Sequence, residues 1–184
     1  MATLMSRLKL RLIRGAREED GTATIPFLMF LPFFMMLVIS SLEMGMLMLR
    51  HVMLERGLDM AVRDLRLGIF KGSYDEFKSL VCKNAAFLPD CKNAIVIELQ
   101  PVSTTTWAPL NSAAICVDRT QPLKPLNNPF VKGAGDQLML VRACAIFDPI
   151  VPTTGLGLHL PKDKSGGYWL VTSSAFVNEP EPGT

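Results

Sequence analysis

The stretch Ile25–Leu49, IPFLMFLPFFMMLVISSLEMGMLML, decides the organisation of this chain because it is almost wholly apolar. An α-helix rises about 1.5 Å per residue, so this stretch extends roughly 37 Å and can cross a hydrocarbon core of about 30 Å. The rest of the 184-residue chain mixes polar and apolar residues in short runs. We therefore predict one transmembrane helix, with room for one ordinary domain beside it.

A cluster of basic residues precedes the apolar stretch and predicts its orientation. Its members are Arg7, Lys9, Arg11, Arg14 and Arg17. The basic residues that follow the stretch are interleaved with acidic ones. Basic flanks stay on the cytoplasmic side, so we predict a single-pass membrane protein with a cytoplasmic N-terminus and with the residues after Leu49 on the other side of the membrane. The net charge of +2 is too small to indicate a nucleic-acid partner.

A cleaved secretory signal is the alternative for this segment. The basic N-region, the apolar run 25–39 and the small residues Ser40 and Ser41 fit such a signal. However, the apolar run resumes after Glu43, and no A-x-A cleavage site follows it. We therefore favour the anchor.

Three residues interrupt the apolar pattern. Pro26 lies in the first turn, where its missing N–H costs little, whereas Pro32 lies deeper and predicts a kink or a freed carbonyl. Glu43 is the one charged residue of the stretch. A carboxylate inside a membrane is costly and often functional, but Glu43 is near the outer end and could instead reach the interface. The sequence leaves both interpretations open.

The helix is expected to continue beyond the membrane. Apolar residues recur at helical spacing, namely Leu54, Leu58, Ala61, Leu65 and Ile69. This pattern predicts an extension over residues 50–70, and hence a helix of roughly forty residues, with Gly57 as a weak point and Gly68 near its end. We expect the apolar stripe to pack against the chain's own domain.

Residues 71–184 are predicted to form an α+β domain with a short helix and an antiparallel sheet of about four strands. Ser73 and Glu76 fit a capping box at the start of a helix over Tyr74–Ala86. Alternating or apolar runs predict strands at Ala94–Leu99, Ala113–Asp118, Gln137–Phe147 and Gly167–Val177. The Pro/Gly-rich segments Gln121–Gly135 and Asp148–Gly166 are predicted to be exposed connections.

All four cysteines, Cys82, Cys91, Cys116 and Cys144, follow the apolar stretch. An even number of cysteines in an exported domain predicts disulfide bonds, whereas four free thiols would indicate a cytosolic domain. Of the three possible pairings, one closes a short loop with Cys82 and Cys91 and links two predicted strands through the other two cysteines. The sequence does not decide among the pairings. A zinc site is disfavoured because the chain has no CxxC pair and only two histidines, so we expect no metal.

Several of these segments together resemble the N-terminal signature of TadE/TadG-type pseudopilins, the minor pilins of the tight-adherence (Flp, type IVc) pilus. The matching segments are Glu19–Phe27 (EDGTATIPF), Leu31-Pro32, Glu43-Met44-Gly45, the helical Leu54–Arg66 and the closing Asn178-Glu179-Pro180. The resemblance implies that a prepilin peptidase cuts between Gly21 and Thr22. The cut would remove a leader of residues 1–21, and residues 22–49 would form the membrane helix.

The resemblance also implies a function and partners. The chain would take part in assembling an adhesive pilus, with Pro26, Pro32, Glu43 and Gly45 in the helix that mediates assembly. It would be held in a bacterial inner membrane with its C-terminal domain in the periplasm, and it would reach the pilus or cell surface after assembly. Its partners would be the inner membrane, the peptidase and other minor and major Tad pilins. No cofactor, nucleic acid or small-molecule substrate is expected.

One departure from the family pattern bears on the role. Most pilins carry Glu at the fifth mature position, where its carboxylate can neutralise the N-terminal amine of a neighbouring subunit, and here that position holds Pro26. A buried charge without its partner is costly, so this substitution should disfavour incorporation along a filament shaft. We therefore hypothesise a priming or tip role.

Two other functions compete with this one. The chain could be a permanently anchored periplasmic binding or scaffolding module that never enters a filament. An anchored enzyme is the least favoured, because the sequence contains no recognisable catalytic motif, and we expect no enzymatic activity.

Overall fold

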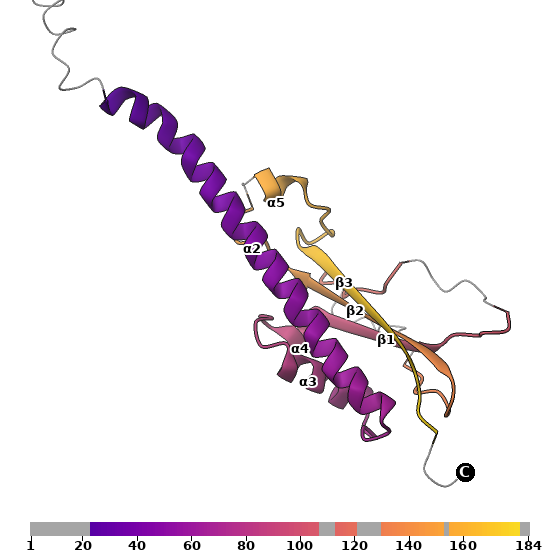
Figure 1. The fold of residues 1–184 in the computed structure, drawn as a ribbon. Helices are drawn as coiled ribbons and strands as arrows, with labels where there is room; N and C mark the ends of the chain where they lie inside the picture. The colour runs from indigo at the N-terminus through magenta and orange to yellow at the C-terminus, as the bar shows by residue number, and fades with distance from the viewer. Residues whose placement is uncertain (1–22, 107–112, 121–129, 153–154, 181–184) are drawn as a thin grey trace, which may run out of the picture. The chain divides into compact units, whose positions relative to one another are not determined.

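The computed structural model describes residues 23–106, 113–120, 130–152 and 155–180 of the chain. A single unbroken helix, α2 (Thr24–Arg66), occupies 43 residues and continues through Pro32 (Figure 1). Among the described residues it is the one helix long and apolar enough to cross a membrane. The predicted helix of roughly forty residues is therefore confirmed, and it is compatible with single-pass anchoring.

The chain divides into two compact units after Ser41. In the first unit, the described residues form the beginning of α2, and most of its large apolar side chains are exposed. They include Ile25, Phe27, Leu28, Met29, Phe30, Phe33, Phe34, Met35, Met36 and Leu37. Side chains of this kind are poorly suited to water, as expected for a segment covered by lipid or by other helices.

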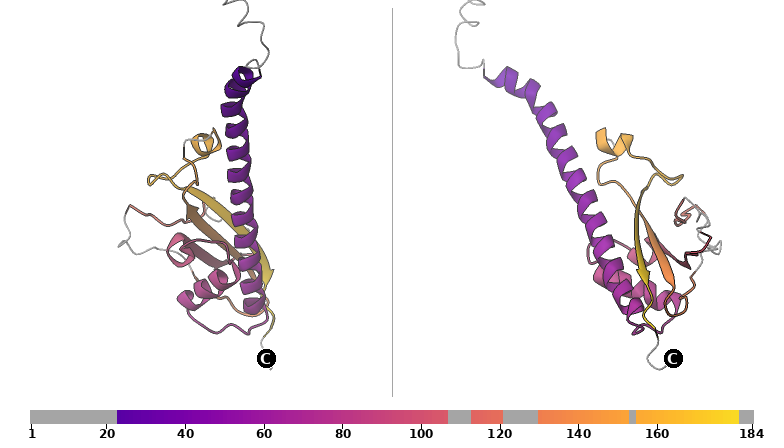
Figure 2. Two further views of the ribbon diagram at one scale, coloured as in Figure 1. Left: turned by 90° about the vertical axis from the view of Figure 1, so that its left-hand side faces the viewer. Right: turned by 45° about the vertical axis from the view of Figure 1, so that its right-hand side comes forward.

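The second unit contains a three-stranded antiparallel sheet in the order β1-β2-β3. Its strands are β1 (Ile95–Pro101), β2 (Leu138–Phe147) and β3 (Tyr168–Val177). The later part of α2 and helices α3 (Tyr74–Asn84) and α4 (Cys91–Ala94) lie on one side of this sheet in both views of Figure 2. The α+β class and three of the predicted strands are therefore confirmed.

The fourth predicted strand, Ala113–Asp118, is wrong, because the structure shows no strand there. Instead of pairing with a neighbouring strand, the Ile115 backbone N–H donates to the Glu98 carboxylate at 3.1 Å. The adjacent Cys116 is tied by a disulfide to Cys144 of β2. A side-chain acceptor and a covalent bond thus hold this segment against the sheet without a ladder of backbone hydrogen bonds.

The predicted apolar stripe of the helix forms the core of the second unit. Leu54, Leu58 and Ala61 are fully buried, and they pack with residues of α3 and of the sheet. The last predicted member, Ile69, is wrong: α2 ends at Arg66, Gly68 adopts a positive φ of 66°, and Ile69 is exposed. Glycine adopts this conformation without strain, so the chain turns away here.

Gly57 is not the weak point that the sequence suggested. A Cβ placed on it would lie 2.8 Å from the Val81 carbonyl oxygen and 2.8 Å from the Ala85 Cβ. The missing side chain therefore lets α2 approach the end of α3 closely. Tertiary contact outweighs the low helix propensity of glycine at this position.

The sequence predicted the start of α3 correctly but missed two short helices. The capping box is confirmed, because the Ser73 N–H donates to Glu76 Oε2 at 2.7 Å and the Glu76 N–H donates to Ser73 Oγ at 3.5 Å. The short helices α4 and α5 (Gly155–His159) were not predicted.

Part of the first Pro/Gly-rich segment, residues 121–129, lies outside the described residues. Phe130 of the same segment is not in an exposed loop, contrary to the prediction. It packs against the core and bridges Leu99 of β1.

Candidate functional site

The disulfides link the domain at two places. Cys82 of α3 is joined to Cys91 of α4, and Cys116 is joined to Cys144 of β2, with Cα–Cα distances of 5.7 and 5.2 Å. No cysteine is free. The structure therefore selects, among the three pairings, the one with a short loop and a link to the strand β2. Among the described residues, no group of three or more His, Cys, Asp or Glu side chains is placed to hold a metal ion.

The predicted assembly residues do not form one constellation. Pro26 and Pro32 lie in the first unit, whereas Glu43 and Gly45 lie in the second. Gly21 and Thr22 lie outside the described residues. A Cβ placed on Gly45 would have nothing within 4 Å, so this glycine faces open space on the surface of α2.

Glu43 is covered by the domain, a feature that the sequence did not reveal. Its exposed fraction is 3%, and it belongs to the same compact unit as the sheet. Leu47, one turn later, is also buried. The domain therefore begins to cover α2 inside the stretch Ile25–Leu49 that was predicted to lie in the membrane.

An arginine fastens α2 to the end of the sheet near Glu43. Arg50 Nη1 donates to the Tyr168 hydroxyl at 2.8 Å and to the Asp148 carbonyl oxygen at 3.3 Å. Its guanidinium lies 5.2 Å from the centroid of the Phe147 ring, within cation–π range. Since Phe147 ends β2 and Tyr168 begins β3, one side chain holds both strands to the helix.

Tyr168 titrates in an unusual environment. Burial raises the pKa of its phenol above the ordinary value, the nearby Arg50 lowers it, and Glu43 and Asp148 raise it. Burial is the largest of these effects. The phenol is therefore held neutral, as a hydrogen-bond partner for Arg50, beyond the pH at which an exposed tyrosine ionises.

A buried ion pair on the other side of the sheet was missed by the sequence interpretation. Glu98 of β1 and Arg142 of β2 stand directly opposite each other, and Arg142 Nη2 lies 3.2 Å from Glu98 Oε2. Both residues are buried. Opposite charges in two otherwise apolar strands were the available signal, but pairing them required the register.

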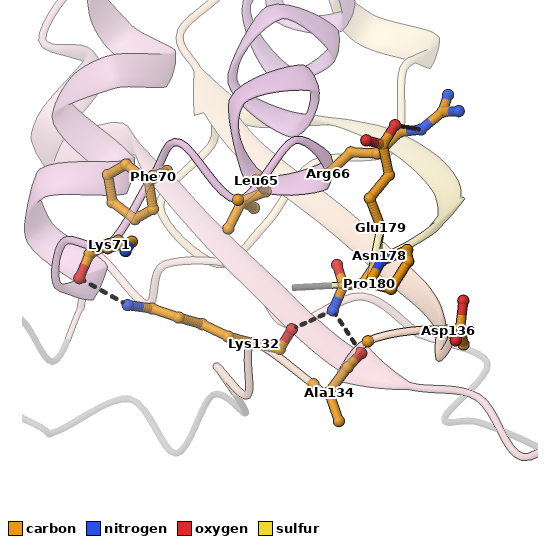
Figure 3. Close-up of a pocket in the computed structure, with 13 residues that line it drawn as sticks. Leu65, Arg66, Phe70, Lys71, Lys132, Ala134, Asp136, Asn178, Glu179 and Pro180 are labelled. Carbon is orange, nitrogen blue, oxygen red and sulfur yellow. Dashed lines mark hydrogen bonds and ion pairs between the residues drawn. The ribbon is translucent and has the colours of Figure 1, made fainter. Parts of the chain in front are cut away.

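A hollow of about 700 Å³ in the second unit lies where α2 ends (Figure 3). Two polar side chains in it donate to backbone carbonyl oxygens. Lys132 Nζ donates to the Lys71 carbonyl oxygen at 3.0 Å, and Asn178 Nδ2 donates to the carbonyl oxygens of Lys132 and Ala134 at 2.8 and 3.1 Å. These contacts fasten the C-terminal segment to the loop after residue 130.

The residue after Asn178 extends this fastening to the helix. The Glu179 N–H donates to the Arg66 carbonyl oxygen at 3.2 Å, and Glu179 Oε1 lies 3.6 Å from Arg66 Nε. The closing Asn-Glu-Pro segment thus satisfies a carbonyl at the C-terminus of α2, one of the groups that a helix end leaves unpaired. The residues that line the hollow join the C-terminal segment to the loop after residue 130 and to the end of α2, and we assign the hollow no ligand.

Comparison with known proteins adds no relative: no family model matches the chain, and no curated protein or solved structure matches it.

Proposed function

We propose that this chain is a minor pilin or pseudopilin that takes part in assembling a Tad/Flp adhesive pilus. The observation that carries the proposal is the single helix of 43 residues. Its beginning exposes apolar side chains, and its later part forms the core of a disulfide-bonded α+β domain. A helix of this kind can anchor the chain in a bilayer before assembly and pack against other helices after it.

The sequence signature supports the same function. The segment Glu19–Phe27 resembles a prepilin cleavage site, and Glu43-Met44-Gly45 resembles the family's intramembrane motif. The closing Asn178-Glu179-Pro180 also resembles the family, and its contacts with the end of α2 give these residues a structural role. The processing, the orientation and the pilus partners are part of the proposal.

The experiment that tests the proposal locates the protein in cells. Antibodies against the periplasmic domain should detect it in sheared pili, and deletion of its gene should reduce the number of pili. Detection in the membrane fraction alone, with normal piliation after deletion, would favour the permanently anchored module instead.

We further propose a priming or tip position, because Pro26 replaces the acid expected at the fifth mature position. Immunogold label should then lie at pilus ends. Pro26→Glu should shift part of the label to the shaft, whereas Ile25→Glu, which adds the same charge one residue earlier, should not. Label spread along shafts of the unmodified pilus would contradict the tip position.

A further inference from the structure

The helix α2 is still apolar at the level where the domain begins to cover it. Glu43 and Leu47 are buried by the domain, yet the exposed fractions of Leu42, Met44 and Met48 are 64%, 41% and 49%. Three large apolar side chains exposed within two turns of a helix indicate that lipid or another protein covers this surface. An apolar medium and the domain therefore meet α2 at the same level.

Arg50 contacts the end of the sheet that lies beside this part of α2. Arg50 donates to the carbonyl oxygen of Asp148, which follows β2, and to the hydroxyl of Tyr168, which begins β3. The connection between these two strands contains α5 (Gly155–His159) and returns to the sheet where Lys162 bridges Tyr168. Figures 1 and 2 agree in placing α5 beyond this end of the strands.

This end of the domain exposes large apolar side chains. The exposed fractions of Ile150, Leu158 and Trp169 are 54%, 64% and 42%, and Lys164 is exposed in the same connection. Tryptophan and lysine beside aliphatic residues are typical of protein surfaces at the boundary between lipid and water. We define these four residues as the loop-end surface.

We propose that the loop-end surface rests in the headgroup region of the same bilayer that α2 spans. The proposal depends on the membrane anchoring in the proposed function, but not on the pilus. It also accounts for the length of the span. Residues 25–41 extend about 26 Å as a helix, short of a hydrocarbon core of about 30 Å, so Leu42 and Met44 complete the crossing and Met48 lies just beyond it, beside the docked domain.

The test measures lipid contact by fluorescence quenching in the full chain. The protein, one copy per nanodisc of phosphatidylethanolamine, phosphatidylglycerol and brominated phosphatidylcholine, carries Trp107→Phe and Trp169→Tyr; tyrosine keeps an interfacial aromatic residue at position 169. Leu158→Trp then reports on the loop-end surface. Ile69→Trp is the matched control, because Ile69 is equally apolar and 66% exposed but follows the opposite end of the helix. Phe33→Trp, at a position 69% exposed, reports on the span.

Brominated lipid should quench the Leu158→Trp protein several-fold more than the Ile69→Trp protein, and should quench the Phe33→Trp protein strongly. Equal, weak quenching at positions 158 and 69 with strong quenching at 33 would overturn the docking and leave the anchor intact. Absent quenching at 33 would overturn the anchor and the docking together. If the Leu158→Trp emission is shielded from water only in nanodiscs that hold two copies, position 158 contacts a second copy, and this result would also overturn the proposal.

Discussion

At the residue scale, the buried pair of Glu98 and Arg142 gives a direct prediction. Glu98→Ala leaves the Arg142 guanidinium buried without this carboxylate, so the unfolding free energy should fall by about 3–5 kcal/mol. The measurement is urea unfolding of the full chain in detergent micelles, followed by tryptophan fluorescence.

The exposed pair of Arg119 and Asp148 is the matched control. Arg119 Nη1 lies 2.6 Å from Asp148 Oδ1, but the Asp148 side chain is 71% exposed. Asp148→Asn should therefore cost less than about 1 kcal/mol. If Glu98→Ala and Asp148→Asn lower the unfolding free energy by the same amount, burial does not make the Glu98–Arg142 pair more stabilising than an exposed pair.

Tyr168 gives a prediction about pH. Because burial raises its folded pKa above the unfolded value of about 10, folding favours the neutral phenol. This contribution to stability is complete below pH of about 10 and is lost as the pH rises through the folded pKa.

The measurement is tyrosinate absorbance of the Tyr74→Phe protein, in which Tyr168 is the remaining tyrosine. The folded protein should titrate at higher pH than the same protein in denaturant. Coincident titration curves would contradict the burial of the phenol.

Residue-scale features were the hardest to predict from sequence. The sequence placed Glu43 in the membrane or at its edge, because its neighbours in the chain are apolar. What decides its environment is the domain that buries it, which is formed by residues far along the chain. The pairing of Glu98 with Arg142 likewise depends on strand register.

At the element scale, two glycines of α2 give opposite predictions. Gly57→Ala should destabilise the domain by about 1–3 kcal/mol, because the new Cβ meets the Val81 carbonyl oxygen and Ala85. Gly45→Ala should be neutral or stabilising by up to about 1 kcal/mol, since open space surrounds this position and alanine favours the helix. Urea unfolding measures both, and a Gly57→Ala protein as stable as the Gly45→Ala protein would contradict the close approach of α2 and α3.

Elements with strong local signals were predictable. The capping box predicted the start of α3, and the alternating run Gly167–Val177 predicted β3, in which Tyr168, Leu170 and Phe176 are buried. The predicted strand Ala113–Asp118 was wrong because an apolar run forms a strand only where a neighbouring strand can pair with it. Gly57 failed because propensity cannot show which partner a helix must approach.

At the scale of the whole molecule, the sequence predicted a long apolar helix followed by an α+β domain, and the structure has both elements. It did not predict where one gives way to the other. The domain already covers one face of the apolar stretch Ile25–Leu49, since Glu43 and Leu47 are buried, whereas Leu42, Met44 and Met48 on the same stretch stay exposed. Local hydropathy marks which side chains avoid water, but not whether lipid or protein covers them.

The central claim, that the helix is made to leave the bilayer and join an assembly, requires removal of the leader. The most direct measurement is the N-terminal peptide of the membrane protein, identified by mass spectrometry in cells with and without the cognate prepilin peptidase. The chain should begin at Thr22 when the peptidase is present and should retain residues 1–21 when it is absent. A chain that retains the leader in the presence of the cognate peptidase would contradict the proposed pilin function.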